Sequence, residues 1–336
     1  MRFHSPGGPE VLSYEDAPNP SLGPGEALVK VKACGVNRID IWTRSGRYAA
    51  PLPHILGADV AGEVASVYPG VTEVRKGDPV IVYPVLYDGT CHFCQNKQFN
   101  RCVRVGLLGT ASDGGYAEFI RAPAADLVNI GELDFKTAAS LPVNFGTTWN
   151  GLASRAGVGP GDIVLVWAPG SGVGYAAIEI SKFLGARVIA TSSSDEKLQF
   201  AKTLGADFAI NYKEEDLVER VSVLTEGLGV SAAFDQIGGE TWGKSLACLR
   251  KGGRMISFGL TSGATAEIDV GRVYRNELGI LGSFGCLKED LVQVLSLASK
   301  GILKPRIFRE MPLQSAREAH EILQSRKVQG KILLIP

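Results

Sequence analysis

The chain has 336 residues, of which 45% are hydrophobic and 21% are charged. These values are ordinary for a globular protein, and the length favours two domains. Its 35 basic and 35 acidic residues cancel, which argues against a nucleic-acid or membrane-surface role driven by bulk charge. The sequence shows neither an apolar run of membrane-spanning length nor a signal-peptide core. We therefore expect a cytoplasmic protein.

Residues 1–120 are rich in glycine and proline and contain short β-like runs at 27–33, 62–67 and 79–82. Frequent turn residues between short strands are typical of a compact, mostly β domain. A cysteine group at Cys91, Cys94 and Cys102 interrupts this pattern. Six cysteines in a chain of this length do not indicate a secreted disulfide scaffold.

A strand–turn–helix–strand unit is predicted in the middle of the chain. A helical stretch at 135–153, broken at Pro142, precedes an apolar strand at 163–168. Glycines at 170, 172 and 174 then lead into a helix at 173–184 and a strand at 187–191. Such a unit holds a dinucleotide pyrophosphate on a helix N-terminus. Tyr175 stands where the strict glycine motif needs glycine or alanine, so an ordinary tight turn remains the alternative.

The same alternation of strands and helices continues to residue 284. Helices are predicted at 195–204, 214–225 and 240–249, and strands at 207–211, 230–236, 254–258 and 278–284. Six strands with crossovers predict an α/β fold with a doubly wound sheet. The tail, with helices at 288–298 and 315–324 and a strand at 331–335, is too short for a domain. We expect it to pack against the N-terminal β domain.

Motifs along the whole chain resemble the medium-chain dehydrogenase/reductase superfamily. They include Ala-Cys-Gly-Val-Asn-Arg-Ile-Asp at 33–40, Leu-Gly-Ala-Asp-Val-Ala-Gly-Glu at 56–63 and the glycine turn. Asn-Tyr-Lys-Glu at 211–214 and Ala-His-Glu-Ile-Leu at 319–323 resemble the quinone oxidoreductase branch, a relative of the zinc-type alcohol dehydrogenases.

This resemblance implies the domain organisation. It places a GroES-like catalytic domain at 1–143, a Rossmann dinucleotide-binding domain at 144–286 and a C-terminal return to the catalytic domain at 287–336. It also implies a cleft between the domains and a homodimer or homotetramer joined through the edges of the Rossmann sheets.

The catalytic-zinc ligands of the zinc-dependent relatives are replaced here. Their Cys, His and Cys fall at Asn37, Ala58 and Val143, so we expect no catalytic zinc. Cys34, a lone thiol close by, is expected to be a buried small hydrophobe. His54 is a lone histidine in an apolar loop and is expected to be structural.

The structural-zinc positions of those relatives fall at Asp88, Cys91, Cys94 and Cys102. Three thiolates and one carboxylate form a closed tetrahedral site, so a structural Zn²⁺ is expected. His92 is an alternative fourth ligand. Without a metal, the same residues would be three free thiols or would include a disulfide.

The end of the second Rossmann strand favours NADP(H) over NAD(H). NAD-specific sites have a carboxylate there, whereas this chain has Thr191 followed by Ser192. Asp195 is interpreted as a helix cap that points away. In resembling quinone oxidoreductases the 2′-phosphate contacts match Lys197, Tyr212 and Arg326. The remaining cofactor positions implied by the resemblance are Ser171, Gly172, Val173, Gly174, Ile237, Phe258, Gly259, Ser283 and Phe284.

The resemblance also implies the reacting centre. Asn37 is the candidate hydrogen-bond donor to the substrate oxygen, Asp40 orients the site, and Thr147 holds the nicotinamide from the opposite side. Trp42 replaces a tyrosine of some relatives, so it shapes an aromatic pocket or simply packs in the core. The sequence predicts hydride transfer from NADPH to small carbonyl compounds: quinones, conjugated enones or activated ketones. An alcohol dehydrogenase or ketone reductase, and a non-catalytic NADPH-binding protein, are the alternatives.

Overall fold

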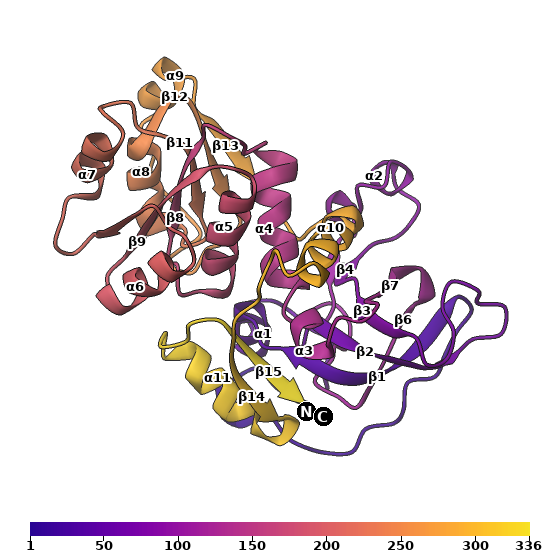
Figure 1. Ribbon diagram of the computed structural model, residues 1–336. Coiled ribbons are helices and arrows are strands. Elements are labelled where there is room, and N and C mark those ends of the chain that lie inside the picture. The colour runs from indigo at the N-terminus through magenta and orange to yellow at the C-terminus, as the bar shows by residue number, and fades with distance from the viewer. The chain divides into compact units, whose positions relative to one another are not determined.

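The computed structural model describes residues 1–336, which form two compact units. The first unit joins Met1–Gly146 to Gly285–Pro336, and the second is the continuous segment Thr147–Phe284. The divisions lie after residues 146 and 284, where the sequence places them after 143 and 286. Figure 1 shows the elements of both units.

A seven-stranded sheet organises the first unit, in the order β14-β15-β1-β2-β3-β7 with β6 also paired to β1. The strands are β1 (Glu26–Gly35), β2 (Asp59–Val67), β3 (Pro79–Val82), β6 (Phe119–Pro123), β7 (Leu127–Asn129), β14 (Ile307–Pro312) and β15 (Lys331–Ile335). Strand β15 runs antiparallel to β1, with Gly35 opposite Leu333. The tail therefore completes the same sheet as the N-terminal strands.

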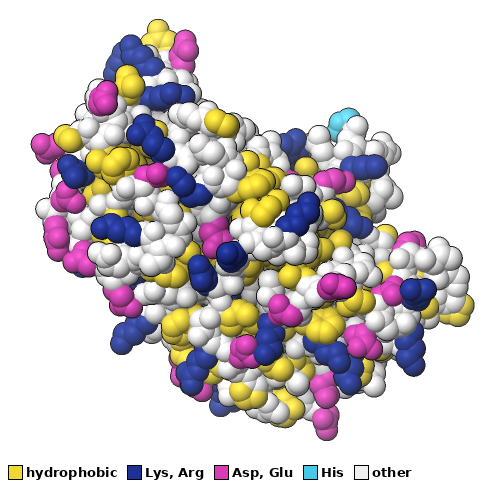
Figure 2. Space-filling model, viewed as in Figure 1, with side chains coloured by type: hydrophobic (Ala, Val, Ile, Leu, Met, Phe, Trp, Pro, Cys, Tyr) yellow, Lys and Arg dark blue, Asp and Glu magenta, His cyan; other side chains and the backbone are white.

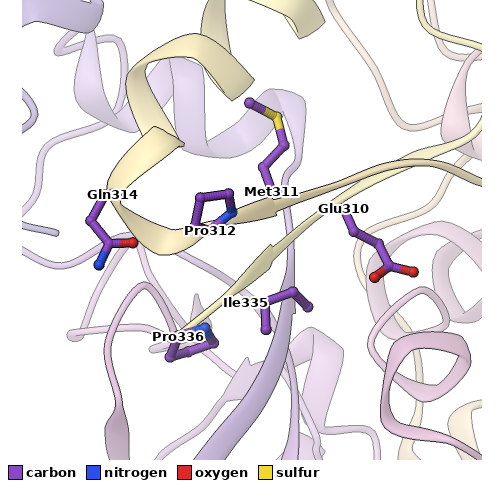
Figure 3. A pocket seen from close by; sticks show the side chains of 6 residues that line it. All are labelled: Glu310, Met311, Pro312, Gln314, Ile335 and Pro336. Atoms are coloured by element: carbon purple, nitrogen blue, oxygen red, sulfur yellow. The ribbon is translucent and has the colours of Figure 1, made fainter.

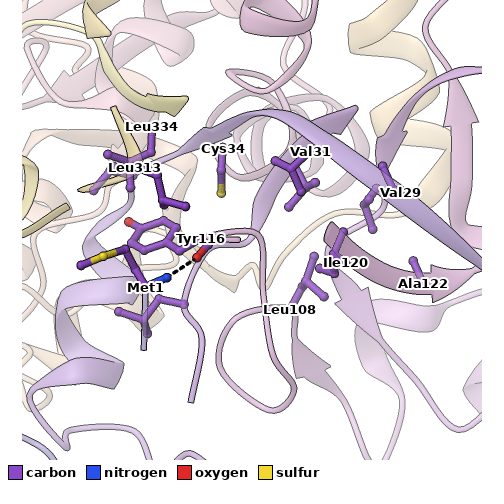
Figure 4. Close-up of a cluster of buried hydrophobic side chains, with 14 of the residues drawn as sticks. Met1, Val29, Val31, Cys34, Leu108, Tyr116, Ile120, Ala122, Leu313 and Leu334 are labelled. Carbon is purple, nitrogen blue, oxygen red and sulfur yellow. Dashed lines mark hydrogen bonds between the residues drawn. The ribbon is translucent and has the colours of Figure 1, made fainter. Parts of the chain in front are cut away.

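The first unit has a core of alternating apolar side chains. Val29 and Val31 of β1 are buried together with Ile120 of β6 and Leu334 of β15. The terminal amine of Met1 donates to the carbonyl of Tyr116 at 2.8 Å within this cluster (Figure 4). The period-two pattern thus turns one face of the sheet inward.

Short elements surround this sheet. They are η1 (Pro9–Val11), α1 (Arg38–Arg44), β4 (Val85–Leu86), α2 (His92–Gln95), η2 (Phe99–Arg101), β5 (Gly106–Leu107), η3 (Ala124–Asp126), α3 (Phe135–Ala138), η4 (Pro142–Gly146), α10 (Lys288–Ser299), η6 (Leu313–Ser315) and α11 (Ala316–Gln324). The predicted break of the helical stretch at Pro142 is confirmed: α3 ends at Ala138, and Pro142 opens the separate π-helix η4, because a missing N–H is no loss at a first helical position.

The second unit is built on a six-stranded parallel sheet in the order β10-β9-β8-β11-β12-β13, which confirms the predicted doubly wound fold. Its strands are β8 (Ile163–Trp167), β9 (Arg187–Ser192), β10 (Phe208–Asn211), β11 (Val230–Asp235), β12 (Leu249–Ser257) and β13 (Gly279–Gly282). The chain runs outward from β8 to β10 and then crosses back to β11, so the order reverses beside β8.

Helices cover both faces of this sheet (Figure 1). They are α4 (Thr147–Trp149), η5 (Asn150–Arg155), α5 (Gly172–Phe183), α6 (Asp195–Thr203), α7 (Leu217–Leu224), α8 (Gly239–Cys248) and α9 (Val270–Arg275). All six residues of β11 are buried, as expected for a strand covered on both faces. The elements that are not predicted from the sequence include the short helices α1 and α9, the strands β6 and β7 and the exposed edge strand β14.

The surface carries charges of both signs. Figure 2 shows lysine and arginine side chains interspersed with aspartate and glutamate on the displayed face. Among the helices, none combines the length and the apolar character that a bilayer crossing requires.

Candidate functional site

The glycine turn joins β8 to the N-terminus of α5. Ser171 caps the helix: its hydroxyl accepts from the amide of Gly174 at 3.0 Å and donates to the carbonyl of Ala168 at 2.8 Å. A Cβ on Gly174 would lie 2.1 Å from that carbonyl oxygen. The glycine is therefore needed for the close approach of helix and strand, and the first amides of α5 lie at the carboxyl end of β8.

The end of β9 uses its hydroxyl groups locally. Thr191 donates to the carbonyl of Ile210 at 3.2 Å, and Ser192 accepts from the amide of Ser194 at 3.3 Å. The predicted cap role of Asp195 is wrong, because Ser194 is the N-cap residue and Asp195 is the first residue of α6. The Asp195 carboxylate accepts from the Asn211 amide at 2.9 Å and is held there.

Lys197 extends from α6 across the glycine turn. A Cβ added to Gly170 would lie 3.3 Å from the Cγ and Cδ atoms of Lys197, so the stem of the lysine covers that glycine. Tyr212, just beyond β10, packs with its ring centroid 5.5 Å from that of Trp167. Two of the three residues predicted to contact the 2′-phosphate, Lys197 and Tyr212, thus lie near the carboxyl edge of the sheet, whereas Arg326 belongs to the first unit.

Arg38 is a candidate phosphate-binding residue that the sequence did not reveal. It begins α1 directly after Asn37, and its guanidinium donates to the carbonyl of Leu323 at 3.5 Å. Burial, and after it the charge of Arg326, lowers the pKa of Arg38. The two guanidinium groups are therefore close enough to repel each other.

The other predicted cofactor residues follow the carboxyl ends of β11, β12 and β13. The amide of Ile237 donates to Asp235 at 2.9 Å, and the ring of Phe258 lies 4.7 Å from that of Phe234. Ser283 donates to the side-chain oxygen of Asn150 at 2.9 Å. Val173 and Gly172 open α5, Gly259 follows β12, and Phe284 is 46% exposed. The sheet thus gathers these residues at one edge.

Asn37 is held from both ends of its amide group. Its Nδ2 donates to Oδ2 of Asp59 at 2.8 Å and to the Gly35 carbonyl at 3.4 Å. Its Oδ1 accepts from the Lys331 ammonium at 2.6 Å. Because an ammonium only donates and a carboxylate only accepts, this is the orientation that the amide must take.

Lys331 and Asp59 form a buried ion pair, with their side chains 2% and 0% exposed. Asp59 also accepts from the backbone amide of Val143 at 2.7 Å. The lysine fits only because residue 35 is glycine, since a Cβ there would lie 2.4 Å from Cε of Lys331. The resemblance equates positions 37 and 143 with zinc ligands. In this structure Asn37 and Val143 both donate to the Asp59 carboxylate, which is already paired with the Lys331 ammonium.

The residues at this centre do not fit a catalytic zinc ion. Zinc takes thiolate, imidazole or carboxylate ligands, whereas positions 37, 58 and 143 supply an amide, a methyl group and an isopropyl group. The one carboxylate, Asp59, accepts from Lys331, Asn37 and Val143. The positive charge beside it is the ammonium of Lys331.

A series of hydrogen-bonded buried polar groups starts at Asp40. The Asp40 carboxylate accepts from the backbone amide of Asn37 at 2.7 Å. The Tyr116 hydroxyl lies 3.1 Å from Asp40 and 3.1 Å from Nε2 of His320, whose Nδ1 lies 3.2 Å from the Arg44 guanidinium. Burial raises the pKa of Asp40 to about 7. Burial, and then the charge of Arg44, lowers the pKa of His320 to about 3.

The neutral state of His320 and the donor chemistry of Arg44 determine which group donates in each of these hydrogen bonds. Arg44 only donates, so Nδ1 of His320 accepts and the neutral ring carries its proton on Nε2. The Nε2–H group therefore donates to the Tyr116 oxygen, and the Tyr116 hydroxyl donates to Asp40. These hydrogen bonds thereby connect α1 to α11. They also hold Asp40 in place to accept from the backbone amide of Asn37.

The two remaining predicted catalytic residues lie in different units. Trp42 is partly buried on α1, with the guanidinium carbon of Arg47 5.0 Å from its ring centroid and the Tyr48 ring 6.0 Å away. Trp42 thus packs against neighbours on its own segment rather than in the core. Thr147 is the first residue of α4 in the second unit.

The segment 88–102, called the cysteine lobe below, brings together a possible set of metal ligands. One ligand atom from each of Asp88, Cys91, Cys94 and Cys102 lies within 4.8 Å of the others. His92, which is exposed, is not part of this group. Three sulfurs and one carboxylate oxygen at this separation suit a tetrahedral site.

Backbone amides prepare this lobe for negative charge. The Sγ of Cys102 accepts from the amides of Asp88 and Arg104, both at 3.3 Å. One oxygen of Asp88 accepts from the amides of Thr90 and Cys91 at 2.8 and 3.0 Å. Hydrogen bonds, first from those two amides, hold the pKa of Asp88 well below its usual range. None of the six cysteines forms a disulfide bond.

Two lone residues are buried, as was expected for Cys34. Cys34 is fully buried, and burial raises the pKa of its thiol. His54 is 1% exposed, with Nδ1 3.5 Å from the Asp113 carboxylate.

A shallow hollow of about 450 Å³ lies elsewhere on the first unit (Figure 3). It is lined by Glu310, Met311, Pro312, Gln314, Ile335 and Pro336. These residues belong to β14, η6 and β15 or, in the case of Pro336, follow β15, and none of them is a predicted site residue. The hollow is therefore a feature of the sheet edge.

Two family models match successive parts of the chain. The model described as "Alcohol dehydrogenase GroES-like domain" matches residues 23–132, and the one described as "Zinc-binding dehydrogenase" matches residues 172–300.

Curated relatives and solved structures extend over the whole chain. Quinone oxidoreductase 1 of Escherichia coli is 34% identical over 100% of this chain and 99% of its own. The NAD-dependent alcohol dehydrogenase of Sulfurisphaera tokodaii is 32% identical over 97% of this chain and 96% of its own. A solved NAD-dependent alcohol dehydrogenase is 40% identical, with a TM-score of 0.95 over the full length of both chains. The chain therefore belongs to the medium-chain dehydrogenase/reductase superfamily of oxidoreductases.

Proposed function

We propose that the chain is an NADPH-dependent oxidoreductase that transfers hydride to quinones, conjugated enones or activated ketones without a catalytic zinc. The buried Lys331–Asp59 ion pair carries this proposal, because it contacts Asn37 and Val143, two positions that the resemblance equates with catalytic-zinc ligands. Without a Lewis acid, a simple ketone oxygen is weakly polarised. Quinones and enones need less help, since the added charge spreads over a conjugated system.

The first unit supplies the groups around the substrate oxygen. The long 3.4 Å bond from Asn37 to the Gly35 carbonyl is the contact that a substrate oxygen replaces, while the 2.8 Å bond to Asp59 keeps the amide oriented. Asp40 positions the Asn37 backbone. Trp42 shapes an aromatic pocket, and Thr147 holds the nicotinamide. NADPH supplies the hydride when bound.

The preference for NADPH rests on cations and on a missing carboxylate. Lys197 covers Gly170 in the glycine turn, and Asp195 is held by Asn211. Arg326 is proposed as a further 2′-phosphate contact on the resemblance alone, and its charge lowers the pKa of Arg38. A 2′-phosphate gains charge-assisted bonds from such groups.

A structural Zn²⁺ is proposed for the lobe of Asp88, Cys91, Cys94 and Cys102, supported by its ligand-atom cluster. The ion would be held by protein ligands alone, which leaves no open position for substrate.

A homodimer or homotetramer is proposed through the edge of the second unit's sheet. Strand β13 is an edge strand, and its outer hydrogen-bonding groups are available to a second copy. Mass measurement of the protein in solution tests this assembly.

The test of the reaction is steady-state oxidation of NADPH with a matched series: a quinone, cyclohexenone, cyclohexanone and a primary alcohol run in reverse. We expect turnover of the quinone and the enone that survives metal removal. Strong alcohol oxidation that disappears with the metal would instead establish the alcohol dehydrogenase alternative, which relatives of similar identity favour. NADPH binding without turnover of any substrate would establish a non-catalytic protein.

A further inference from the structure

Gln236 lies where the strand order of the second unit reverses. It follows β11, which pairs in parallel with β8, so that Phe234 lies opposite Val166. Continuing this register places Gln236 level with Ala168, the first residue of the glycine turn. In doubly wound folds the ligand binds in the crevice at this reversal.

The Gln236 amide bridges β11 and the glycine turn. Its Nε2 donates to the Trp167 carbonyl at 2.6 Å and to the Ser171 hydroxyl at 3.3 Å. Both hydrogens are thereby used. The reverse orientation of the amide would place two oxygens against each other at Trp167, so the carbonyl end must point away from the turn.

The other end of this amide has no partner. Gln236 is 6% exposed, and its Oε1 is buried without a hydrogen-bond donor. Buried acceptors are nearly always paired, because an unpaired one loses its hydration without compensation. A buried acceptor at the ligand crevice therefore indicates a donor that arrives with the ligand.

The sheet order identifies the donor. The adenosine half of a dinucleotide lies on the side of the second strand, β9, with the pyrophosphate on the N-terminus of α5. Strand β11 lies on the other side of β8, so the nicotinamide half lies there. We infer that Oε1 of Gln236 accepts a hydrogen bond from a hydroxyl group of the nicotinamide-side ribose. This inference rests on the proposed function.

Neighbouring backbone keeps the carbonyl end of Gln236 in place. Gly259 packs so tightly on this residue that an added Cβ would lie 2.0 Å from the Gln236 backbone oxygen. The side chain is thus fixed at its base by Gly259 and at its Nε2 by Trp167 and Ser171. An acceptor held in this way is ready before the cofactor arrives, so little ordering is needed on binding.

The test is a binding cycle between protein and cofactor. Wild type and Gln236→Met are titrated with NADPH and with the analogue in which the nicotinamide-ribose hydroxyls are replaced by hydrogen. We expect the analogue to bind wild type about tenfold more weakly, the size of one lost hydrogen bond of about 1.4 kcal/mol. The variant should bind both compounds with the same, weakened affinity. Equal losses on removal of the hydroxyls from wild type and variant would overturn the inference.

A second measurement separates this role from bracing of the turn. Adenosine 2′,5′-bisphosphate, which lacks the nicotinamide half, should bind wild type and Gln236→Met within about twofold. A parallel loss for this probe would mean that Gln236 only supports the turn, and would overturn the inference. Ser245→Ala, which removes a buried hydroxyl bonded to Asp235, is the control and should leave the cycle unchanged. Wild type that binds no dinucleotide would instead refute the proposed function.

Discussion

The ammonium of Lys331 donates to the side-chain oxygen of Asn37 at 2.6 Å, although 294 residues separate them. Lys331 enters the centre from the last strand of the chain, and Asn37 follows the first strand of the same sheet. The ion pair with Asp59 completes the arrangement. A fixed internal cation therefore lies against position 37, which the resemblance equates with a catalytic-zinc ligand.

Lys331→Met should destabilise the protein by about 3–5 kcal/mol, because it leaves the buried Asp59 charge without a partner. Adding Asp59→Asn should recover most of that loss, since both charges are then removed. Urea unfolding of the two variants measures the difference. An equal loss in the single and double variants would contradict a dominant role for the ion pair. The pair Arg254–Asp162, at 2.7 Å in the second unit, provides a control on a partly exposed ion pair.

Two buried groups should make stability depend on pH in opposite directions. The pKa of Asp40 is raised by burial to about 7, so its stabilisation is complete below its unfolded pKa and is lost as pH rises towards 7. The pKa of His320 is lowered by burial to about 3, so its stabilisation is present above its unfolded pKa and is lost as pH falls. Each slope has a limit of about 1.4 kcal/mol per pH unit.

Single substitutions should separate these slopes. His320→Gln should become more stable as pH falls from 7 to 5, because the Asp40 contribution is then unopposed. Asp40→Asn should become less stable over the same range. Unfolding free energies at pH 5, 6 and 7 test both signs, and parallel profiles for the two variants would contradict the assignment.

Elemental analysis should find one zinc per chain, and Cys94→Ser should lose it. Chelation should lower the melting temperature before it affects the chemistry, because the metal stabilises residues 88–102 and is not part of the reacting centre. Cys248→Ser, a buried cysteine of the second unit, should keep its zinc. Metal-replete protein without zinc would refute this site.

Lys197→Ala should weaken NADPH binding by about tenfold or more and leave NADH unchanged. A charge-assisted phosphate contact contributes about 1.5–3 kcal/mol, and only NADPH carries the 2′-phosphate. Lys202→Ala, on an exposed position of the same helix, is the matched control. Equal losses for the two cofactors in Lys197→Ala would show that the lysine does not recognise the 2′-phosphate.

The sequence predicted those parts of the protein whose signals are local. The glycine turn and the six parallel strands follow from short apolar runs, and the lobe around Cys91 follows from ligand spacing within a single loop. Strand β12 was harder: it begins at Leu249 rather than 254, since Gly252, at φ +68°, lies inside an irregular pairing. Pattern alone does not show such irregular pairing.

The buried polar groups could not be predicted in the same way. Lys331 looks like the polar start of an apolar strand, and His320 like one residue of an amphipathic helix. Their roles depend on contacts with Asn37 and Tyr116, which only the assembled sheet creates. A lysine opening an otherwise apolar strand directly after Gly330 was the signal available for Lys331, and Gln236 gave no signal without its neighbours.

The two units are completed at different stages of protein synthesis. Residues 147–284 form a continuous segment, so the second unit is complete before the tail is synthesised. The first unit needs β15, which pairs with β1 only after residues 331–335 have been made. Until then Asp59 lacks its cation and β1 lacks a neighbour. The buried centre of Lys331, Asp59 and Asn37 is therefore the last part of the molecule to form. A chain that stops before Lys331 would carry a finished second unit attached to an open sheet.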